Sequence, residues 1–299
     1  MTKLKDWLMP LSMLTGALFY QKFASLGGLT AILIFIMLFF TFNKLSPKSI
    51  GLHRLHAILL SIQLIVSVGL YFLIRPYNEI LAQGVMIYIF APSASASAVI
   101  TQMLGGDMAF VTTYTMIANL MVALLSPMLF SYMYDVGNVD FIQSSLTIFG
   151  KVFPLLFGPL AIAWIIRFAT PNLQKRIDKY SFLSFYIWLL ALVIVTARLV
   201  ESIKRLPSGD YSDLIYLSLA ALICCVIQFA TGKLIGSRYN RLIAGGQALG
   251  QKNTLLAIWL TQSFLHPMVA LAPSMYILWQ NIINSYQIAR ANRKKRESQ

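Results

Sequence analysis

The sequence has 299 residues, of which 58% are hydrophobic and only 11% are charged. Soluble domains contain about 25% charged residues, so this composition excludes an ordinary soluble protein and predicts a multi-pass protein of the cell membrane, embedded in the lipid bilayer. Lysine and arginine exceed aspartate and glutamate by 24 to 10. The positive-inside rule explains that excess in a membrane protein, and we expect no nucleic-acid partner.

Ten segments are candidate membrane spans, each of which needs about 20 mostly apolar residues. In chain order they cover residues 7–20, 26–43, 55–74, 82–104, 108–134, 141–168, 180–200, 211–235, 242–264 and 268–289. Their connections are short, so we expect an all-α integral membrane protein without a separate soluble domain. Lys3 and Lys5 before the first span resemble the start of a signal peptide, but Asp6 and the lack of a clean cleavage site favour a retained span.

Two of these spans carry features that interrupt a helix. The fourth span (82–104) contains Pro92, which removes a backbone donor, followed by alternating serines and alanines. The ninth span (242–264) holds three glycines within residues 245–254, and each glycine weakens a helix by about 1 kcal/mol. Lys252 lies in the same stretch, where a charge at membrane depth costs at least ~2.5 kcal/mol. We expect both spans to be discontinuous and to line a polar cavity.

The charges of the loops predict the orientation of the chain. With both termini in the cytoplasm, seventeen lysines and arginines fall on the cytoplasmic side and five on the outside, which leaves Lys151 and Lys252 at membrane depth. The positive-inside rule therefore favours cytoplasmic termini. The basic run at 290–296 is then a cytoplasmic tail that lies against anionic lipid headgroups.

Ten spans divide into two sets of five, and an odd number per set gives the two sets opposite orientations. We expect a first inverted repeat at residues 1–134 and a second one at residues 135–299. The discontinuous spans are the fourth of each set. Paired interrupted helices at matching positions of inverted halves indicate the binding site of a secondary transporter.

Several motifs in this arrangement resemble the bile acid:sodium symporter family, most clearly over residues 91–133 and 245–290. The fourth span of the family reads Pro-Gly-Gly-Thr-Ala-Ser-Asn-Val, and here Pro92 begins the run Pro-Ser-Ala-Ser-Ala-Ser-Ala-Val. The ninth span of the family carries Glu-x-Gly-Met-Gln-Asn-Ser, and here Ala248 begins Ala-Leu-Gly-Gln-Lys-Asn-Thr. The chain therefore resembles a divergent, bacterial-type member of that family.

The resemblance extends to the Ser-Pro pair of the fifth span (126–127) and to the Trp-x-Asn motif of the tenth (279–281). It implies a ten-helix fold with a panel domain and a core domain, crossing fourth and ninth spans, and transport of a small organic anion by alternating access. It places two asparagines among the substrate contacts, and the helix start after Pro92 adds backbone N–H groups that attract anions. The predicted substrate-binding residues are Ser95, Ala96, Asn253 and Asn281.

The first sodium site of the family is only partly matched in this sequence. Alanine, valine and alanine stand at positions 98, 111 and 248, where the family has asparagine, serine and glutamate. No shift of the alignment restores the glutamate, because no Asp or Glu lies at depth in the predicted spans. The predicted cation-site or coupling residues are Lys252, Gln251, Gln247, Gln63, Ser97 and Thr115.

The second sodium site keeps Gln63, but Lys252 stands where the family has a glutamine ligand. A shift of one residue would place Gln247 or Gln251 at the ligand positions instead. The added ammonium repels a cation, so sodium is doubtful, and we expect no metal site and no cofactor. Our hypothesis is that Lys252 replaces the bound cation. Burial disfavours the charged form of an amine. If Lys252 loses its proton when the cavity faces one side of the membrane and regains it when the cavity faces the other, transport is proton-coupled. If Lys252 stays charged, the protein is a uniporter or an exchanger.

Several alternatives remain open at this stage. An enzyme is not expected, because the sequence lacks clustered aspartates in its spans and a His-Glu-x-x-His motif. A sensor or scaffold without transport, a sodium-dependent organic acid symporter, and another ten-span fold such as the auxin-efflux type are the alternatives. Lys151 is expected to reach a lipid headgroup. The sequence does not indicate the identity of the substrate or the oligomeric state.

Overall fold

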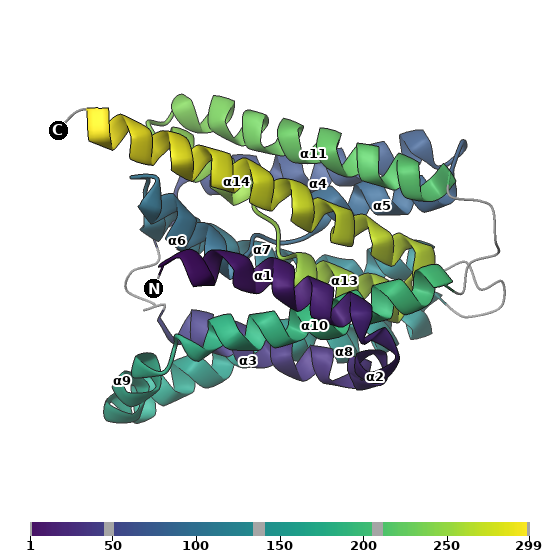
Figure 1. Ribbon diagram of the computed structural model, residues 1–299, viewed down its shortest axis with the longest axis horizontal. Coiled ribbons are helices and arrows are strands. Elements are labelled where there is room, and N and C mark those ends of the chain that lie inside the picture. The colour runs from purple at the N-terminus through teal and green to yellow at the C-terminus, as the bar shows by residue number, and fades with distance from the viewer. Residues whose placement is uncertain (1, 45–50, 134–140, 205–211, 298–299) are drawn as a thin grey trace. The chain divides into compact units, whose positions relative to one another are not determined.

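The computed structural model describes residues 2–44, 51–133, 141–204 and 212–297, which form helices joined by turns (Figure 1). Among these residues the single pairing of extended backbone is an isolated antiparallel bridge between Ser93 and Lys252. The prediction of an all-α protein is therefore confirmed.

Six helical segments of the described chain are long and apolar enough to cross a membrane, which confirms a multi-pass membrane protein. These segments are Tyr20–Asn43, Arg54–Ile74, Met108–Met133, Phe141–Ala169, Leu183–Glu201 and Ser212–Ser237. The predicted fourth and ninth spans are each divided into two shorter helices. The count of ten spans and their arrangement as two inverted repeats, 1–134 and 135–299, stay a prediction.

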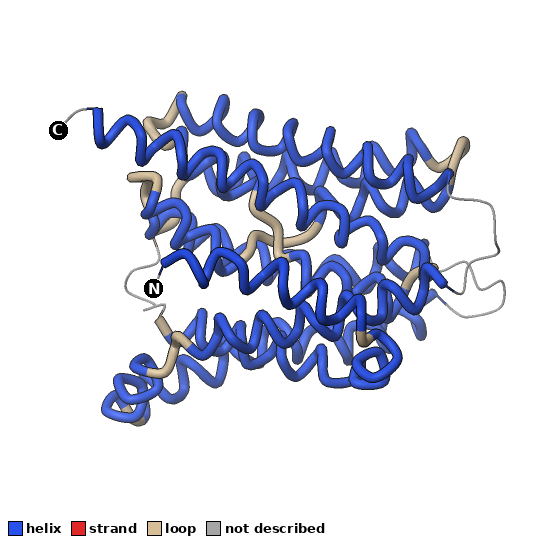
Figure 2. The backbone as a smooth tube through the Cα atoms, in the orientation of Figure 1, coloured by secondary structure: helices blue, strands red, loops and turns tan. Residues whose placement is uncertain are grey.

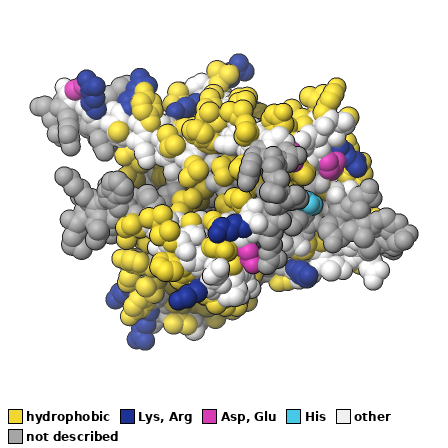
Figure 3. Space-filling model, turned by 45° about the vertical axis from the view of Figure 1, so that its right-hand side comes forward, with side chains coloured by type: hydrophobic (Ala, Val, Ile, Leu, Met, Phe, Trp, Pro, Cys, Tyr) yellow, Lys and Arg dark blue, Asp and Glu magenta, His cyan; other side chains and the backbone are white. Residues whose placement is uncertain are grey.

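Apolar side chains cover the outward faces of these helices. In α11 (Ser212–Ser237), the side chains of Ile215, Leu219, Ile223 and Ile227 are 54–57% exposed. Residues four apart lie on one face of a helix, so together they form an apolar stripe. Figure 3 likewise shows hydrophobic side chains over much of the described surface on the visible face. A bilayer explains such exposed apolar faces, which water would disfavour.

The chain forms two compact units, and each is assembled from three separate stretches. The first unit consists of Met1–Pro47, Ala123–Asp210 and Ile258–Ala270, and the second of Lys48–Val122, Tyr211–Ala257 and Leu271–Gln299. Each unit therefore contains segments from both predicted repeats.

The first unit is a set of packed helices around α1 and α10. Its elements are α1 (Thr2–Leu18), α2 (Tyr20–Phe23), η1 (Ala24–Gly28), α3 (Leu29–Asn43), the end of α7 (Met108–Met133), α8 (Phe141–Ala169), α9 (Pro171–Lys179), α10 (Leu183–Lys204), the end of α13 (Thr254–Phe264) and η3 (Pro267–Ala270). Helix α1 packs along α10, and α3 packs along α8 (Figure 1). A Cβ at Gly16 would lie 2.3 Å from the carbonyl oxygen of Val193, so glycine is needed for this close approach.

The connection between the predicted sixth and seventh spans contains a further helix, α9. Its side chain Gln174 is buried and donates to the carbonyl of Asn43 at 3.0 Å, and Arg167 donates to the same carbonyl at 2.6 Å. The bond from Gln174 ties α9 to the last residue of α3, and the bond from Arg167 ties α8 to the same residue. The sequence pattern missed α9 because its hydrophobic content is low and its charge is high.

The second unit holds both interrupted helices. Its elements are α4 (Arg54–Ile74), α5 (Glu79–Phe90), α6 (Ser95–Met103), the first part of α7, α11, α12 (Leu242–Gly250), the start of α13 and α14 (Leu271–Glu297). Helices α11 and α12 approach so closely that a Cβ at Gly245 would lie 2.3 Å from the carbonyl oxygen of Gly232. Small residues allow such close contact between membrane helices. Gly245 thus lies inside α12 and serves packing, and the interruption begins at Gln251.

Candidate substrate and cation site

The two interruptions lie side by side and bond to each other. Between α5 and α6 the amide of Ala94 donates to the carbonyl of Gln251 at 2.9 Å, and between α12 and α13 the amide of Asn253 donates to the carbonyl of Pro92 at 2.8 Å. Figure 2 shows the loop segments that separate these helices. Irregular backbone at membrane depth needs partners within the protein, and each interruption supplies them to the other.

The end of α5 carries four carbonyls without partners in its own helix, as every helix end does. Three buried side chains donate to all four of them. Gln228 Nε2 lies 3.1 Å from the oxygen of Tyr88, and Lys252 Nζ lies 2.7 Å from the oxygen of Ile89. Gln63 Nε2 contacts the last two carbonyls, those of residues 90 and 91, at 2.8 and 3.1 Å. The donors come from α4, from α11 and from the interruption after α12.

Lys252 contributes the amine donor of this set. Its side chain is 1% exposed, and within the described chain no carboxylate forms an ion pair with it. The C-terminal end of a helix carries a partial negative charge, which favours the protonated form of an amine placed there. Gln280 holds the backbone of Lys252, accepting from its amide at 2.9 Å and donating to its carbonyl at 3.3 Å.

Gln63 has a fixed orientation because Tyr114 holds its oxygen. The hydroxyl of Tyr114 donates to Gln63 Oε1 at 2.6 Å, and both residues are fully buried. Gln63 therefore turns its NH₂ group, and not its oxygen, toward the end of α5. An amide in this orientation is a donor to carbonyls and offers no ligand to a cation there.

Gln247 and Gln251 are joined through a residue that the sequence analysis missed, Asn284 of α14. Gln247 Nε2 donates to Asn284 Oδ1 at 2.8 Å, and Asn284 Nδ2 donates to Gln251 Oε1. Gln280 lies one turn before Asn284 on the same face of α14. The sequence feature that could have identified Asn284 is its spacing of four from Gln280 within the predicted tenth span (268–289).

Ser97 and Thr115 also lie together, with Ser93 as a third hydroxyl. The oxygens of Ser97 and Thr115 are 3.5 Å apart, and those of Ser93 and Ser97 are 2.9 Å apart. Ser97 donates to the carbonyl of Ala94 at 2.6 Å, and Thr115 donates to that of Val111 at 2.9 Å. Their protons are therefore engaged in bonds to nearby backbone.

The four predicted substrate residues occupy different environments. Ser95 is half-buried and Ala96 is exposed at the start of α6. Asn253 is half-buried and accepts from the amide of Leu256 at 3.2 Å, so its side chain caps α13. Asn281 donates to the carbonyl of Ile277 in its own helix at 2.7 Å. Their role in binding a substrate stays a prediction.

Comparison with protein families gives a match to the sodium bile acid symporter family over residues 28–206. The match covers more than half of the 299 residues, and it confirms the family resemblance. It includes Gln63, Ser97 and Thr115, whereas Lys252 lies beyond the matched residues. Comparison with curated proteins gave no match.

Proposed function

The chain belongs to the sodium bile acid symporter family, and we propose that this secondary transporter moves a small organic anion by alternating access without coupling to sodium. In this proposal the ten spans form two inverted repeats. The second unit acts as the core, because it contains the paired interruptions, and the first acts as the panel. Both termini are cytoplasmic.

The observation that carries the proposal is the contact of Lys252 Nζ with the carbonyl oxygen of Ile89 at 2.7 Å. Free carbonyls at the end of an interrupted helix are suitable ligands for Na⁺. Here the ammonium uses one of them, and the neighbouring carbonyls accept from Gln228 and Gln63. A second positive charge at this helix end would lie beside Lys252 without a described carboxylate to offset it. Lys252 therefore acts as a cation fixed to the chain.

The anion binds near the interruptions, with Ser95 and Ala96 at the start of α6, Asn253 at the start of α13, and Asn281 on α14. The starts of α6 and α13 present backbone N–H groups with a partial positive charge, which suits a carboxylate. The ammonium of Lys252 adds a positive charge close to the same interruption.

The experiment is uptake of labelled organic acids into proteoliposomes, with Na⁺ replaced by a large organic cation and the pH varied on each side. Wild-type uptake should be insensitive to this replacement. Lys252→Gln should lose at least about tenfold in uptake, because a hydrogen bond to a charged group contributes roughly 1.5–3 kcal/mol. Lys252→Arg keeps the charge and serves as the matched variant. Strong sodium dependence of the wild type would contradict the proposal.

The same assay separates the two ways in which a fixed lysine can act. Uptake that responds to a pH gradient, and loses that response in Lys252→Arg, indicates proton coupling through Lys252. Uptake that ignores the gradient indicates a uniporter or an exchanger. A protein that binds organic acids in a thermal-stabilisation screen but takes up none of them would be a sensor with a transporter fold.

A further inference from the structure

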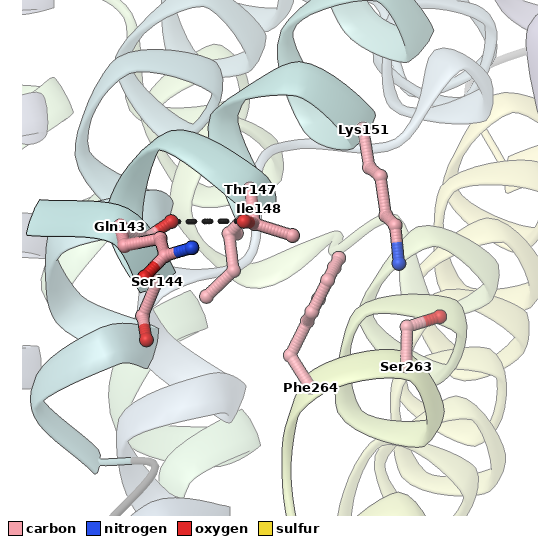
Figure 4. A pocket seen from close by; sticks show the side chains of 7 residues that line it. All are labelled: Gln143, Ser144, Thr147, Ile148, Lys151, Ser263 and Phe264. Carbon is pink, nitrogen blue, oxygen red and sulfur yellow. Dashed lines mark hydrogen bonds between the residues drawn. The ribbon is translucent and has the colours of Figure 1, made fainter. Parts of the chain in front are cut away.

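A pocket in the first unit is lined by residues other than those of the paired interruptions. Its volume is about 310 Å³. The lining residues are Gln143, Ser144, Thr147, Ile148, Lys151, Ser263 and Phe264 (Figure 4). Helix α8 contributes the first five and the end of α13 contributes the last two. The pocket shares no residue with the transport site described above. Most of its polar residues lie on α8, which is otherwise largely apolar.

The polar residues of the pocket form one face of α8. Gln143, Thr147 and Lys151 are spaced by four, which places them above one another on the same side of the helix. Beyond Lys151, the next lysine or arginine of α8 is Arg167, sixteen residues later. A polar face of two turns, confined to one end of a long apolar helix, indicates a localised site.

Lys151 is exposed and its side chain extends toward Ser263 and Phe264 at the end of α13 (Figure 4). Its nearest described interaction is with the ring of Phe264, whose centroid is 5.9 Å from Nζ. Among the described residues the ammonium has no ion-pair or hydrogen-bond partner. None of the described residues that line the pocket is acidic, so the formal charge that they contribute is positive.

The other polar groups can supplement this charge. The hydroxyl of Thr147 donates to the carbonyl of Gln143 at 2.8 Å, so its proton is engaged. The hydroxyls of Ser144 and Ser263 have no hydrogen bond within the described chain and can donate to a ligand. Phe264 packs against Phe130 and Trp259, with centroids at 6.2 and 5.8 Å, and presents a rigid apolar wall.

We propose that this pocket binds the carboxylate of a compact organic anion, with Lys151 as the counter-ion and Phe264 as the apolar contact. The inference rests on the proposed function for the class of solute and deepens it by adding a second binding site. About 310 Å³ lies at the lower limit of small-molecule pockets, which run from roughly 300 to 1,000 Å³. The site therefore suits a small acid and not one with a bulky ring system.

The proposed orientation places the start of α8 on the outer side of the membrane. Lys151 is the eleventh residue of this helix, so a solute from outside reaches it after about two to three turns. A small acid would then enter the pocket from the outer side of the membrane.

The test is the binding of benzoate and of butyrate to the full-length protein in lipid nanodiscs, measured by calorimetry, with benzyl alcohol as the uncharged analogue. Benzoate should bind the wild type, and Lys151→Gln should weaken this binding at least about tenfold, because the charge-assisted contact is lost. Lys151→Arg should retain affinity within about threefold. Lys204→Gln is the control, because Lys204 lies over the ring of Tyr20 and does not line the pocket.

Unchanged benzoate affinity in Lys151→Gln would overturn the inference, as would equal affinity for benzyl alcohol or the absence of carboxylate binding to the wild type. The binding measurement does not depend on transport, so the pocket and the proposed function are tested independently of each other. A protein that binds benzoate through Lys151 but takes up no organic acid would overturn the proposed function and leave the pocket in place. Uptake that depends on Lys252, with benzoate binding indifferent to Lys151, would overturn the pocket alone.

Discussion

At the scale of the residue, the amide of Gln63 is held at both ends. Its nitrogen donates to the end of α5, and its oxygen accepts from Tyr114 at 2.6 Å. Tyr114→Phe removes that donor and leaves a buried oxygen without a partner, which should cost about 1–3 kcal/mol of stability. Thermal unfolding in detergent measures the change. Tyr186→Phe, whose side chain is 50% exposed, is the matched control and should be nearly neutral; equal stability of the two variants would contradict this account.

At the scale of the element, the close contact of α11 with α12 depends on glycine. In Gly245→Ala the new Cβ would lie 2.3 Å from the backbone oxygen of Gly232, so a helix must shift. Overpacking of this kind typically costs about 1–3 kcal/mol, and the unfolding temperature should fall accordingly. Gly69→Ala in α4 meets nothing within 4 Å and should be neutral or slightly stabilising. A similar response at both glycines would show that the contact is looser than described.

At the scale of the whole molecule, the proposed orientation makes a direct prediction about the two ends of α4. Leu52 is 77% exposed before this helix, and Tyr77 is 88% exposed after it. With cytoplasmic termini, Tyr77→Cys should react with a membrane-impermeant maleimide in intact cells, whereas Leu52→Cys should react only after lysis. Cys224 and Cys225 are buried and should stay unlabelled. The reverse pattern would invert the topology.

The sequence predicted the helical class, the family and the position of both interruptions, because Pro92 and Lys252 each carry a large cost at membrane depth. It did not predict the partners of those interruptions. An amide such as Gln228 or Gln280 in an apolar helix can bond to any neighbouring helix, and its target depends on packing. Gly245 was taken as a cause of the break, whereas it lies within α12 and allows contact with α11.

In the proposed function, the attachment of the cation to the chain determines which gradient can drive the carrier. A mobile sodium ion brings charge and energy inward with each solute, while an ammonium bonded at Ile89 returns with the protein and adds none. An interior-negative potential then favours the exit of a monovalent anion by about 2.3 kcal/mol per 100 mV, roughly fifty-fold at equilibrium. Unless a proton accompanies each molecule, such a carrier would not accumulate acids in the cell but would release them.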